Sequence, residues 1–228
     1  MFVNNLDPVA FEFLSFQIRW YSLAYIFGFL IGWFYIKNFL IKDLREKTLV
    51  DDFITYLILG VIIGGSLGYV IFYNFFYYLS HPFEIFFIWQ GGMSFHGGLL
   101  GVCLATYIFT QKYNLNFFRY TDLVSLVAPI GIFLGRVANF INSELYGRET
   151  DFIFSVNFNK VDNLFRHPSQ LYESFFEGIV LFIILNFLWK KFSEIPGVIS
   201  SLFLIFYSLF RFIIEFTREP DADRKSVV

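Results

Sequence analysis

Two arginines of this sequence lie inside long apolar segments. Arg136 falls in the segment 123–141, and Arg211 falls in the segment 195–216. A charge near the centre of a bilayer costs about 2.5 to 3.5 kcal/mol even on a lenient insertion scale, so such residues persist when they face a polar cavity or pair with one another. Because a guanidinium group is a planar fork of donors that matches a phosphate, both arginines are candidate phosphate ligands.

Arg136 begins a polar run at the end of its segment. Asn139 follows three residues later and therefore shares a helix face with Arg136, and Glu144 comes just after the apolar residues end. This grouping favours a binding site near one membrane surface. The alternative is that Arg136 only extends its side chain to that surface, and the residues alone leave both interpretations open.

Arg211 belongs to a polar stripe on its segment. Tyr207, Arg211 and Glu215 are spaced four apart, which on a helix separates successive members by about 40° around the axis. Such a stripe is suited to hold an anion, with Arg211 as a charge clamp. The alternative, that Arg211 and Glu215 simply neutralise each other, also stays open.

His96 begins the apolar segment 93–109, between the glycine pairs 91–92 and 97–98 that leave space around it. A neutral imidazole accepts a proton at physiological pH, so His96 is a candidate general base. A packed, hydrogen-bonded role is the commoner reason for a single histidine on an apolar helix. No second His or Cys stands at metal-ligand spacing, and we therefore expect no metal site.

These residues require a scaffold that lies in a membrane. The sequence is 57% hydrophobic and only 16% charged, whereas a soluble domain is roughly a quarter charged. Its apolar residues form runs near the length of about 20 that a helix needs to cross a bilayer. We predict an all-α, polytopic transmembrane helical bundle that forms a single integral membrane domain, residues 1–228. The six predicted spans are residues 18–36, 53–76, 93–109, 123–141, 172–189 and 195–216, with an external loop region at 142–171.

The distribution of Lys and Arg predicts the orientation of these spans. The first, third and fifth connections carry basic residues, whereas the second, residues 81–90, carries none. By the positive-inside rule the odd connections are cytoplasmic and the N-terminus lies outside. The first basic residue, Arg19, comes after eighteen residues without Lys or Arg, so no cleavable signal peptide is predicted.

Composition also excludes several functions. A net charge of −2 gives no reason to expect a nucleic-acid partner, and the single cysteine, Cys103, supports neither a disulfide framework nor a thiolate metal site. The main alternative from another class is a small transporter or channel for an anionic metabolite, with Arg136 and Arg211 lining its pathway. We find no internal repeat, which argues against this alternative because many transporters are built on repeats.

Five sequence blocks together resemble the prolipoprotein diacylglyceryl transferase family. They occur in the family's order over nearly the whole chain, and the third is the most specific. The blocks are residues 19–21 (RWY), 92–98 (GMSFHGG), 135–148 (GRVANFINSELYGR), 167–173 (HPSQLYE) and 218–221 (REPD).

The resemblance implies a multi-pass enzyme of the bacterial inner membrane with a periplasmic N-terminus. Such an enzyme moves the diacylglyceryl group of phosphatidylglycerol to the lipobox cysteine thiol of a prolipoprotein signal peptide and releases glycerol phosphate. The implied partners are phosphatidylglycerol, prolipoprotein signal peptides and the lipid bilayer, and no cofactor or metal is implied. The residues that match functional positions of the family are His96, Arg211, Tyr21 and Tyr207 for catalysis, and Arg136, Asn139, Glu144 and Glu215 for phosphatidylglycerol binding.

The sequence departs from the family pattern at two places. Ser143 stands where the resemblance predicts glycine. The family pattern also continues beyond residues 218–221 with a seventh span, which the 228 residues here do not contain. A truncated, inactive relative is therefore a second alternative to an active transferase.

Overall fold

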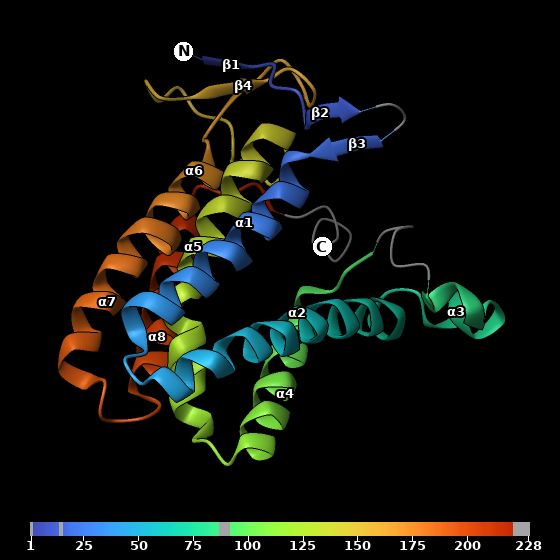
Figure 1. Ribbon diagram of the computed structural model, residues 1–228. Coiled ribbons are helices and arrows are strands. Elements are labelled where there is room, and N and C mark those ends of the chain that lie inside the picture. The colour runs from blue at the N-terminus through green and yellow to red at the C-terminus, as the bar shows by residue number, and fades with distance from the viewer. Residues whose placement is uncertain (1, 14–15, 87–91, 221–228) are drawn as a thin grey trace. The chain divides into compact units, whose positions relative to one another are not determined.

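The computed structural model describes residues 2–13, 16–86 and 92–220 (Figure 1). Its α-helices are α1 (Trp20–Tyr35), α2 (Leu44–Phe72), α3 (Phe75–Ser80), α4 (Phe95–Tyr113), α5 (Phe117–Asn142), α6 (Ser169–Glu173), α7 (Leu181–Phe192) and α8 (Val198–Glu215). The π-helix Ile36–Leu40 continues α1, and the π-helix Ser174–Val180 joins α6 to α7. A short 3₁₀-helix spans Pro82–Phe86. The strands are β1 (Phe2–Asn4), β2 (Val9–Phe13), β3 (Phe16–Arg19), β4 (Val156–Phe158) and β5 (Phe165–Arg166).

The polytopic helical class predicted from the sequence is confirmed. Within the described residues, five helical segments are long and apolar enough to cross a membrane, and they match five of the six predicted spans in order. The remaining predicted span, the third, residues 93–109, forms α4 but falls outside this set. Helix α4 contains three glycines, and Gln111 and Lys112 lie in its last turn. The five segments are Trp20–Leu40, Leu44–Phe72, Phe117–Asn142, Ser169–Phe192 and Val198–Glu215.

The second span begins nine residues before its predicted start because its helix has a strong N-terminal cap. Asp43 precedes α2 in an extended conformation, and its Oδ1 accepts hydrogen bonds from the backbone N–H groups of Arg45 (2.6 Å) and Glu46 (3.4 Å). This satisfies two donors that a helix start otherwise leaves without a partner. The charged first turns of α2 therefore become helical although their hydropathy does not predict a span.

Contacts cluster into two compact units, residues 1–32 with 124–228 and residues 33–123. In the first unit α7 and α8 pack together, and α1 packs on α5 where Gly28 faces Gly131. A Cβ added at Gly28 would lie 3.4 Å from the Cα of Gly131, so the two backbones approach closely. The single domain over residues 1–228 stays a prediction.

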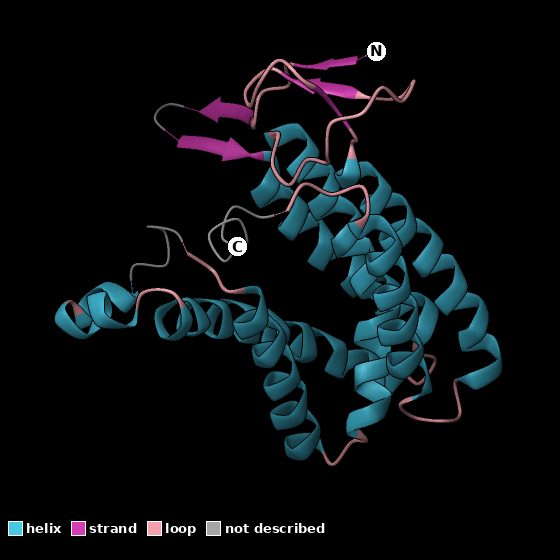
Figure 2. Cartoon of the chain, turned by 180° about the vertical axis from the view of Figure 1, so that it is seen from behind, coloured by secondary structure: helices cyan, strands magenta, loops and turns pink. Residues whose placement is uncertain are grey.

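A small β-layer covers one end of the helices of the first unit (Figure 2). β1 pairs in parallel with β4, β4 pairs antiparallel with β5, and β2 and β3 form a separate hairpin. The fully buried Asn4 donates a hydrogen bond of 2.6 Å from Nδ2 to the backbone oxygen of Phe140 near the end of α5. The ring of Phe140 packs against Phe158 of β4 with centroids 5.7 Å apart. These contacts tie the N-terminus to the segment that follows Arg136.

In the second unit, α2 and α4 pack along a line of glycines. A Cβ added at Gly64 would lie 2.4 Å from the backbone oxygen of Gly97, and one at Gly101 would lie 2.0 Å from that of Gly60. No side chain larger than hydrogen fits at these positions without moving backbone. The glycines spaced four apart on these two helices therefore let their backbones pack closely.

Candidate active site

Three arginines of the first unit converge on one carboxylate, that of Glu173 at the end of α6. Glu173 Oε1 accepts hydrogen bonds from Nη1 of Arg211 and from Nη1 of Arg218, the latter at 2.8 Å. Its Oε2 lies 2.9 Å from Nε of Arg136. The Glu173 side chain is 0% exposed, and a buried charge requires this kind of compensation.

The three arginines come from parts of the chain far apart in sequence. Arg136 lies near the end of α5, Arg211 lies in the C-terminal half of α8, and Arg218 follows the end of α8. The structure thus brings together the two arginines that the sequence singled out and adds a third. The ion pair with Glu173 also shows that Arg136 does more than extend its side chain to the membrane surface.

Arg136 keeps donors available for a ligand. Its Nε faces Glu173, and within the described part of the chain neither of its Nη groups donates a hydrogen bond to a protein atom. The side chain is 20% exposed. An anion that reaches Arg136 therefore meets a partly open guanidinium group whose orientation a buried carboxylate fixes.

Glu215 is a second carboxylate partner in this cluster. Its Oε2 lies 3.0 Å from Nη2 of Arg211 and 3.6 Å from Nε of Arg218. The ion pair between Arg211 and Glu215 that the sequence left open as an alternative is therefore present. Glu215 is not the sole partner of Arg211, because the same guanidinium group also bonds to the more deeply buried Glu173.

A widened turn of helix holds Glu173 beside α5. The π-helix Ser174–Val180 follows it directly, an arrangement frequent at functional sites. A Cβ added at Gly178 would lie 2.7 Å from the Cβ of Phe133, and Ser174 Oγ donates a 3.3 Å hydrogen bond to the backbone oxygen of Phe133. Because Phe133 lies one turn before Arg136 on α5, these contacts fix the distance between Arg136 and Glu173.

Glu177 lies one turn beyond Glu173 and is also 0% exposed. Within the described residues neither of its carboxylate oxygens has a hydrogen-bond partner. It is close enough to interact electrostatically with Glu173 and with the three arginines. Glu177 therefore shares the burial of Glu173 without its ion pairs.

The end of α5 positions Glu144 through a Schellman motif. The backbone N–H of Glu144 donates to the oxygen of Asn139 at 2.9 Å, and that of Ser143 donates to the oxygen of Phe140 at 3.1 Å. Asn139 Nδ2 in turn donates to Glu144 Oε2 at 3.1 Å. Asn139 and Glu144 are thus brought together, as the sequence predicts, and bond to each other.

Ser143 occupies the left-handed position of this motif, with φ of 60°. Glycine adopts such a conformation without steric cost, whereas a residue with a Cβ does so at some expense in free energy. The tertiary structure therefore gives a reason for the glycine that the resemblance predicts at this position.

The segment after α5 returns to the end of α8 and holds Arg218. Gly147 N–H donates to the oxygen of His167, and Arg148 N–H donates to the oxygen of Thr217, both at 2.9 Å. Arg148 Nε donates to the backbone oxygen of Arg218 at 2.7 Å. A Cβ at Gly147 would lie 2.5 Å from each of two backbone oxygens, so this passage requires glycine.

Side chains at the start of α6 bond to the preceding segment. Ser169 Oγ donates a 2.9 Å hydrogen bond to the backbone oxygen of Leu145, and no side chain caps this helix within the described residues. Gln170 Nε2 likewise donates to the backbone oxygen of Glu144 at 2.6 Å. These two side chains join α6 to the segment between α5 and α6, whose backbone carbonyls accept their hydrogen bonds.

The two predicted tyrosines differ in their surroundings. Tyr207 lies on α8, stacks on Phe203 with centroids 5.7 Å apart, and is close enough to Arg136 and Arg211 for electrostatic interaction. Tyr21, in the first turn of α1, is exposed, and its Oη lies 3.5 Å from that of Tyr25. The structure therefore places Tyr207 near the arginine cluster, whereas Tyr21 contacts Tyr25.

His96 belongs to the second unit, where it is exposed in the first turn of α4. Ser94 caps this helix by accepting the N–H of Gly97 at 3.2 Å, and the N–H of Ser94 donates to the oxygen of Gly65 at 2.9 Å. The helix start that carries His96 is therefore anchored on α2, and the imidazole is accessible.

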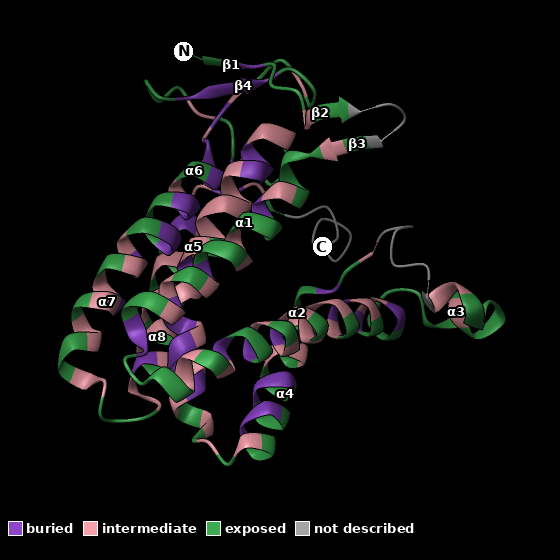
Figure 3. Cartoon of the chain, viewed as in Figure 1, coloured by how far each residue is buried: buried purple, intermediate pink, exposed green. Residues whose placement is uncertain are grey.

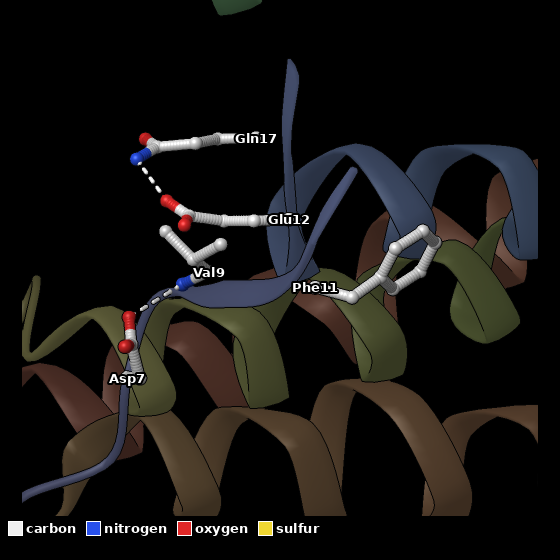
Figure 4. Close-up of a pocket in the computed structure, with 5 residues that line it drawn as sticks. All are labelled: Asp7, Val9, Phe11, Glu12 and Gln17. Carbon is white, nitrogen blue, oxygen red and sulfur yellow. Dashed lines mark hydrogen bonds between the residues drawn. The ribbon is translucent and has the colours of Figure 1, made fainter. Parts of the chain in front are cut away.

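The pocket drawn in Figure 4 contains no predicted site residue. It has a volume of 580 Å³ and lies on the β2–β3 hairpin, where Gln17 bonds to Glu12 and the N–H of Val9 bonds to Asp7 Oδ1 at 2.9 Å. Among the described residues no group of three His, Cys, Asp or Glu side chains is placed to hold a metal ion. The arginine cluster is thus the candidate site.

Glu173 and Arg218 are the residues that sequence reasoning missed as site residues. A signal was present for Glu173, because it is an acidic residue at the start of an apolar span. Arg218 lies in the block 218–221, whose last residue, Asp221, is outside the described residues. Nothing in the spacing of these residues indicates that they meet.

Comparison with known proteins finds a matching family and several similar sequences. The model of the family described as prolipoprotein diacylglyceryl transferase matches residues 8–227. A phosphatidylglycerol–prolipoprotein diacylglyceryl transferase of Rickettsia typhi is similar to the chain, with 50% identity over 97% of this chain and 87% of that protein. Proteins of the same name from Rickettsia felis and Rickettsia canadensis are also 50% identical, over 95% and 97% of this chain and 85% and 87% of their own lengths.

Proposed function

Because the chain belongs to the prolipoprotein diacylglyceryl transferase family, we propose that it transfers the diacylglyceryl group of phosphatidylglycerol to the lipobox cysteine thiol of prolipoproteins. This reaction is the first step of bacterial lipoprotein maturation. The observation that carries the proposal is the convergence of Arg136, Arg211 and Arg218 on the buried Glu173. It offers an anionic headgroup an oriented cationic surface in a membrane-spanning helical protein.

In this reaction the thiolate sulfur of the substrate forms a bond to the terminal glyceryl carbon of the diacylglyceryl group. The bond between that carbon and the phosphate oxygen breaks, and glycerol phosphate leaves with the electron pair. Arg136 binds the phosphodiester through its available Nη groups, and Arg211 stabilises the charge that develops on the leaving phosphate. Glu173 and Glu215 hold these guanidinium groups in place.

The thiol must lose its proton because the thiolate is the nucleophile. We assign this step to His96 or to a tyrosine, Tyr207 or Tyr21, as general base. The exposure of His96 at a capped helix start supports its access to a substrate. Asn139 and Glu144 support headgroup binding by fixing the end of α5 that carries Arg136.

We further propose that the chain lies in the bacterial inner membrane with its N-terminus in the periplasm. The basic residues of the odd connections support this orientation. It places the end of α5, with Arg136 and Glu144, toward the outer leaflet, where lipid headgroups and translocated prolipoproteins are both accessible.

Arg136→Gln tests the assignment of the phosphate ligand. Membranes that contain this variant and phosphatidylglycerol should give no detectable lipid mass shift on a prolipoprotein peptide, because the neutral amide cannot pair with the phosphodiester. The matched control is Arg119→Gln near the opposite end of α5, whose guanidinium lies 3.7 Å from Glu46. The control should keep the activity of the unmodified chain.

Near-normal transfer by Arg136→Gln would contradict the proposed phosphate ligand. Loss of activity in both variants would mean that substitutions on α5 disturb the helix as a whole, and would not support Arg136 as a phosphate ligand. Anion flux through liposomes without a lipid mass shift would favour the transporter alternative. Failure of the unmodified chain to give the mass shift would favour an inactive relative.

A further inference from the structure

The external segment between α5 and α6 presents an apolar turn. The backbone N–H of Ser155 donates a 2.8 Å hydrogen bond to the oxygen of Phe152, which closes a four-residue turn. Ile153 and Phe154 occupy its two central positions and are 72% and 70% exposed. The N–H of Phe152 bonds to Thr150 Oγ1 at 3.2 Å. The turn is therefore built by its own hydrogen bonds and holds both apolar side chains outward.

The centre of an exposed turn is an unusual position for such side chains. Gly, Pro, Asn, Asp and Ser dominate turns because their backbone or polar side chains suit them. Here the rings of Phe152 and Phe154 pack edge to face with centroids 5.4 Å apart. A packed apolar group that projects from a turn is typical of an interaction surface and not of a loop that only links two helices.

This surface is continuous with the exposed apolar side of the segment 169–192, which is long and apolar enough to cross a membrane. An apolar groove of 660 Å³ lies at the turn, and its lining includes Phe154, Leu171 and Tyr172. From Leu171 a stripe of exposed apolar side chains continues along the span 169–192 at every fourth residue. Its members are Leu171, Phe175, Ile179, Ile183 and Phe187. Figure 3 shows exposed residues along the outer side of α7.

From this continuity we propose that the turn Phe152–Ser155 inserts into the bilayer beside the start of α6, with Ile153 and Phe154 at the boundary between headgroups and acyl chains. Large apolar and aromatic side chains are favoured at that depth. The turn then anchors the external segment whose other residues, Gly147 and Arg148, hold Arg218. Insertion of this turn into a lipid surface does not depend on the proposed reaction.

Site-specific quenching tests this insertion. The full chain carries Cys103→Ser, which removes its exposed natural cysteine, and either Ile153→Cys or the control Asn163→Cys. Asn163 is an exposed residue of the same external segment, between β4 and β5. Each cysteine is labelled with bimane, and the protein is placed in nanodiscs of phosphatidylglycerol and phosphatidylcholine, with or without a lipid that carries a doxyl group near its headgroup.

We expect the doxyl lipid to cause loss of fluorescence at position 153 and little loss at position 163, with blue-shifted emission at 153. Equal quenching at both positions, or none at 153, would overturn the proposal. Disulfide cross-linking between two unlabelled copies of Ile153→Cys, without lipid quenching of the labelled protein, would assign the surface to a second copy. Protection by an added prolipoprotein peptide without quenching would assign it to that peptide. Either result would also overturn the proposal. A polar Ile153→Asn variant that is labelled at position 154 gives an independent check, because insertion predicts weaker quenching there.

Discussion

Replacing Glu173 with Gln removes the charge to which three arginines are paired and keeps the size of the side chain. The Glu173 side chain is 0% exposed, and its partners Arg136, Arg211 and Arg218 are 20%, 29% and 5% exposed. Removing one partner of a buried ion pair destabilises a protein by about 3 to 5 kcal/mol, because the other charge is left without compensation. We expect Glu173→Gln to lower the free energy of unfolding by an amount in this range.

The same change should reduce the rate of diacylglyceryl transfer. Without Glu173 the guanidinium group of Arg136 loses the contact at 2.9 Å that orients it, and misplacement of a reacting group by 1 Å lowers a rate by about 100-fold. Two assays on the purified protein measure both effects: thermal unfolding in detergent, and the lipid mass shift of a prolipoprotein peptide as a function of phosphatidylglycerol concentration.

Glu177→Gln is the matched control for this experiment. Glu177 is equally buried and lies on the same helix face, but no hydrogen bond reaches its carboxylate from the described residues. Its replacement removes no ion pair or hydrogen bond from the described residues, so it should not lower the free energy of unfolding. A Glu173→Gln variant as stable and active as Glu177→Gln would refute the view that Glu173 organises the arginines.

A second variant separates charge from packing. Combining Glu173→Gln with Arg218→Met removes the most buried of the three cations together with its partner. Changes in the free energy of unfolding are not additive for residues in one ion-pair network. The double variant should therefore be more stable than the sum of the two single changes predicts. Additive losses would contradict a direct ion pair between the two residues.

Three further predictions concern the segment between α5 and α6. Gly147→Ala should destabilise the protein by more than about 1 kcal/mol and lower transfer activity, because its Cβ would meet backbone oxygens at 2.5 Å; an unchanged melting temperature would contradict this. Ser143→Gly should stabilise the protein by about 1 kcal/mol in thermal unfolding by relieving its φ of 60°, whereas a lower midpoint would contradict it. Hydrogen bonds from Arg166 lower the pKa of Asp162 below its ordinary value of 3.8, so the ionised pair contributes stability above that pH and loses it as the pH falls further. The difference in melting temperature between the unmodified chain and Asp162→Asn should therefore shrink below pH 3.8, and a constant difference would exclude the linkage.

Local features of the sequence predict much of the helical scaffold. A run of about 20 apolar residues satisfies its backbone hydrogen bonds within one helix and buries its side chains in lipid, so hydropathy alone locates such spans. Hydropathy does not predict the charged first turns of α2, because Asp43 determines where that helix begins. Hydropathy also does not predict the short strands, because each strand exists only through its pairing with another segment.

The sequence by itself determined which cations stand inside apolar segments, since Arg136 and Arg211 are costly there whatever the fold. Only the tertiary structure decided that both meet Glu173 and that Arg218 joins them. The reason is that such a meeting depends on the packing of α5, α6 and α8, which is fixed by contacts such as Gly178 against Phe133 between residues far apart in the chain. Spacing along one helix reports neighbours on that helix, whereas a buried ion-pair cluster is a property of the helices together.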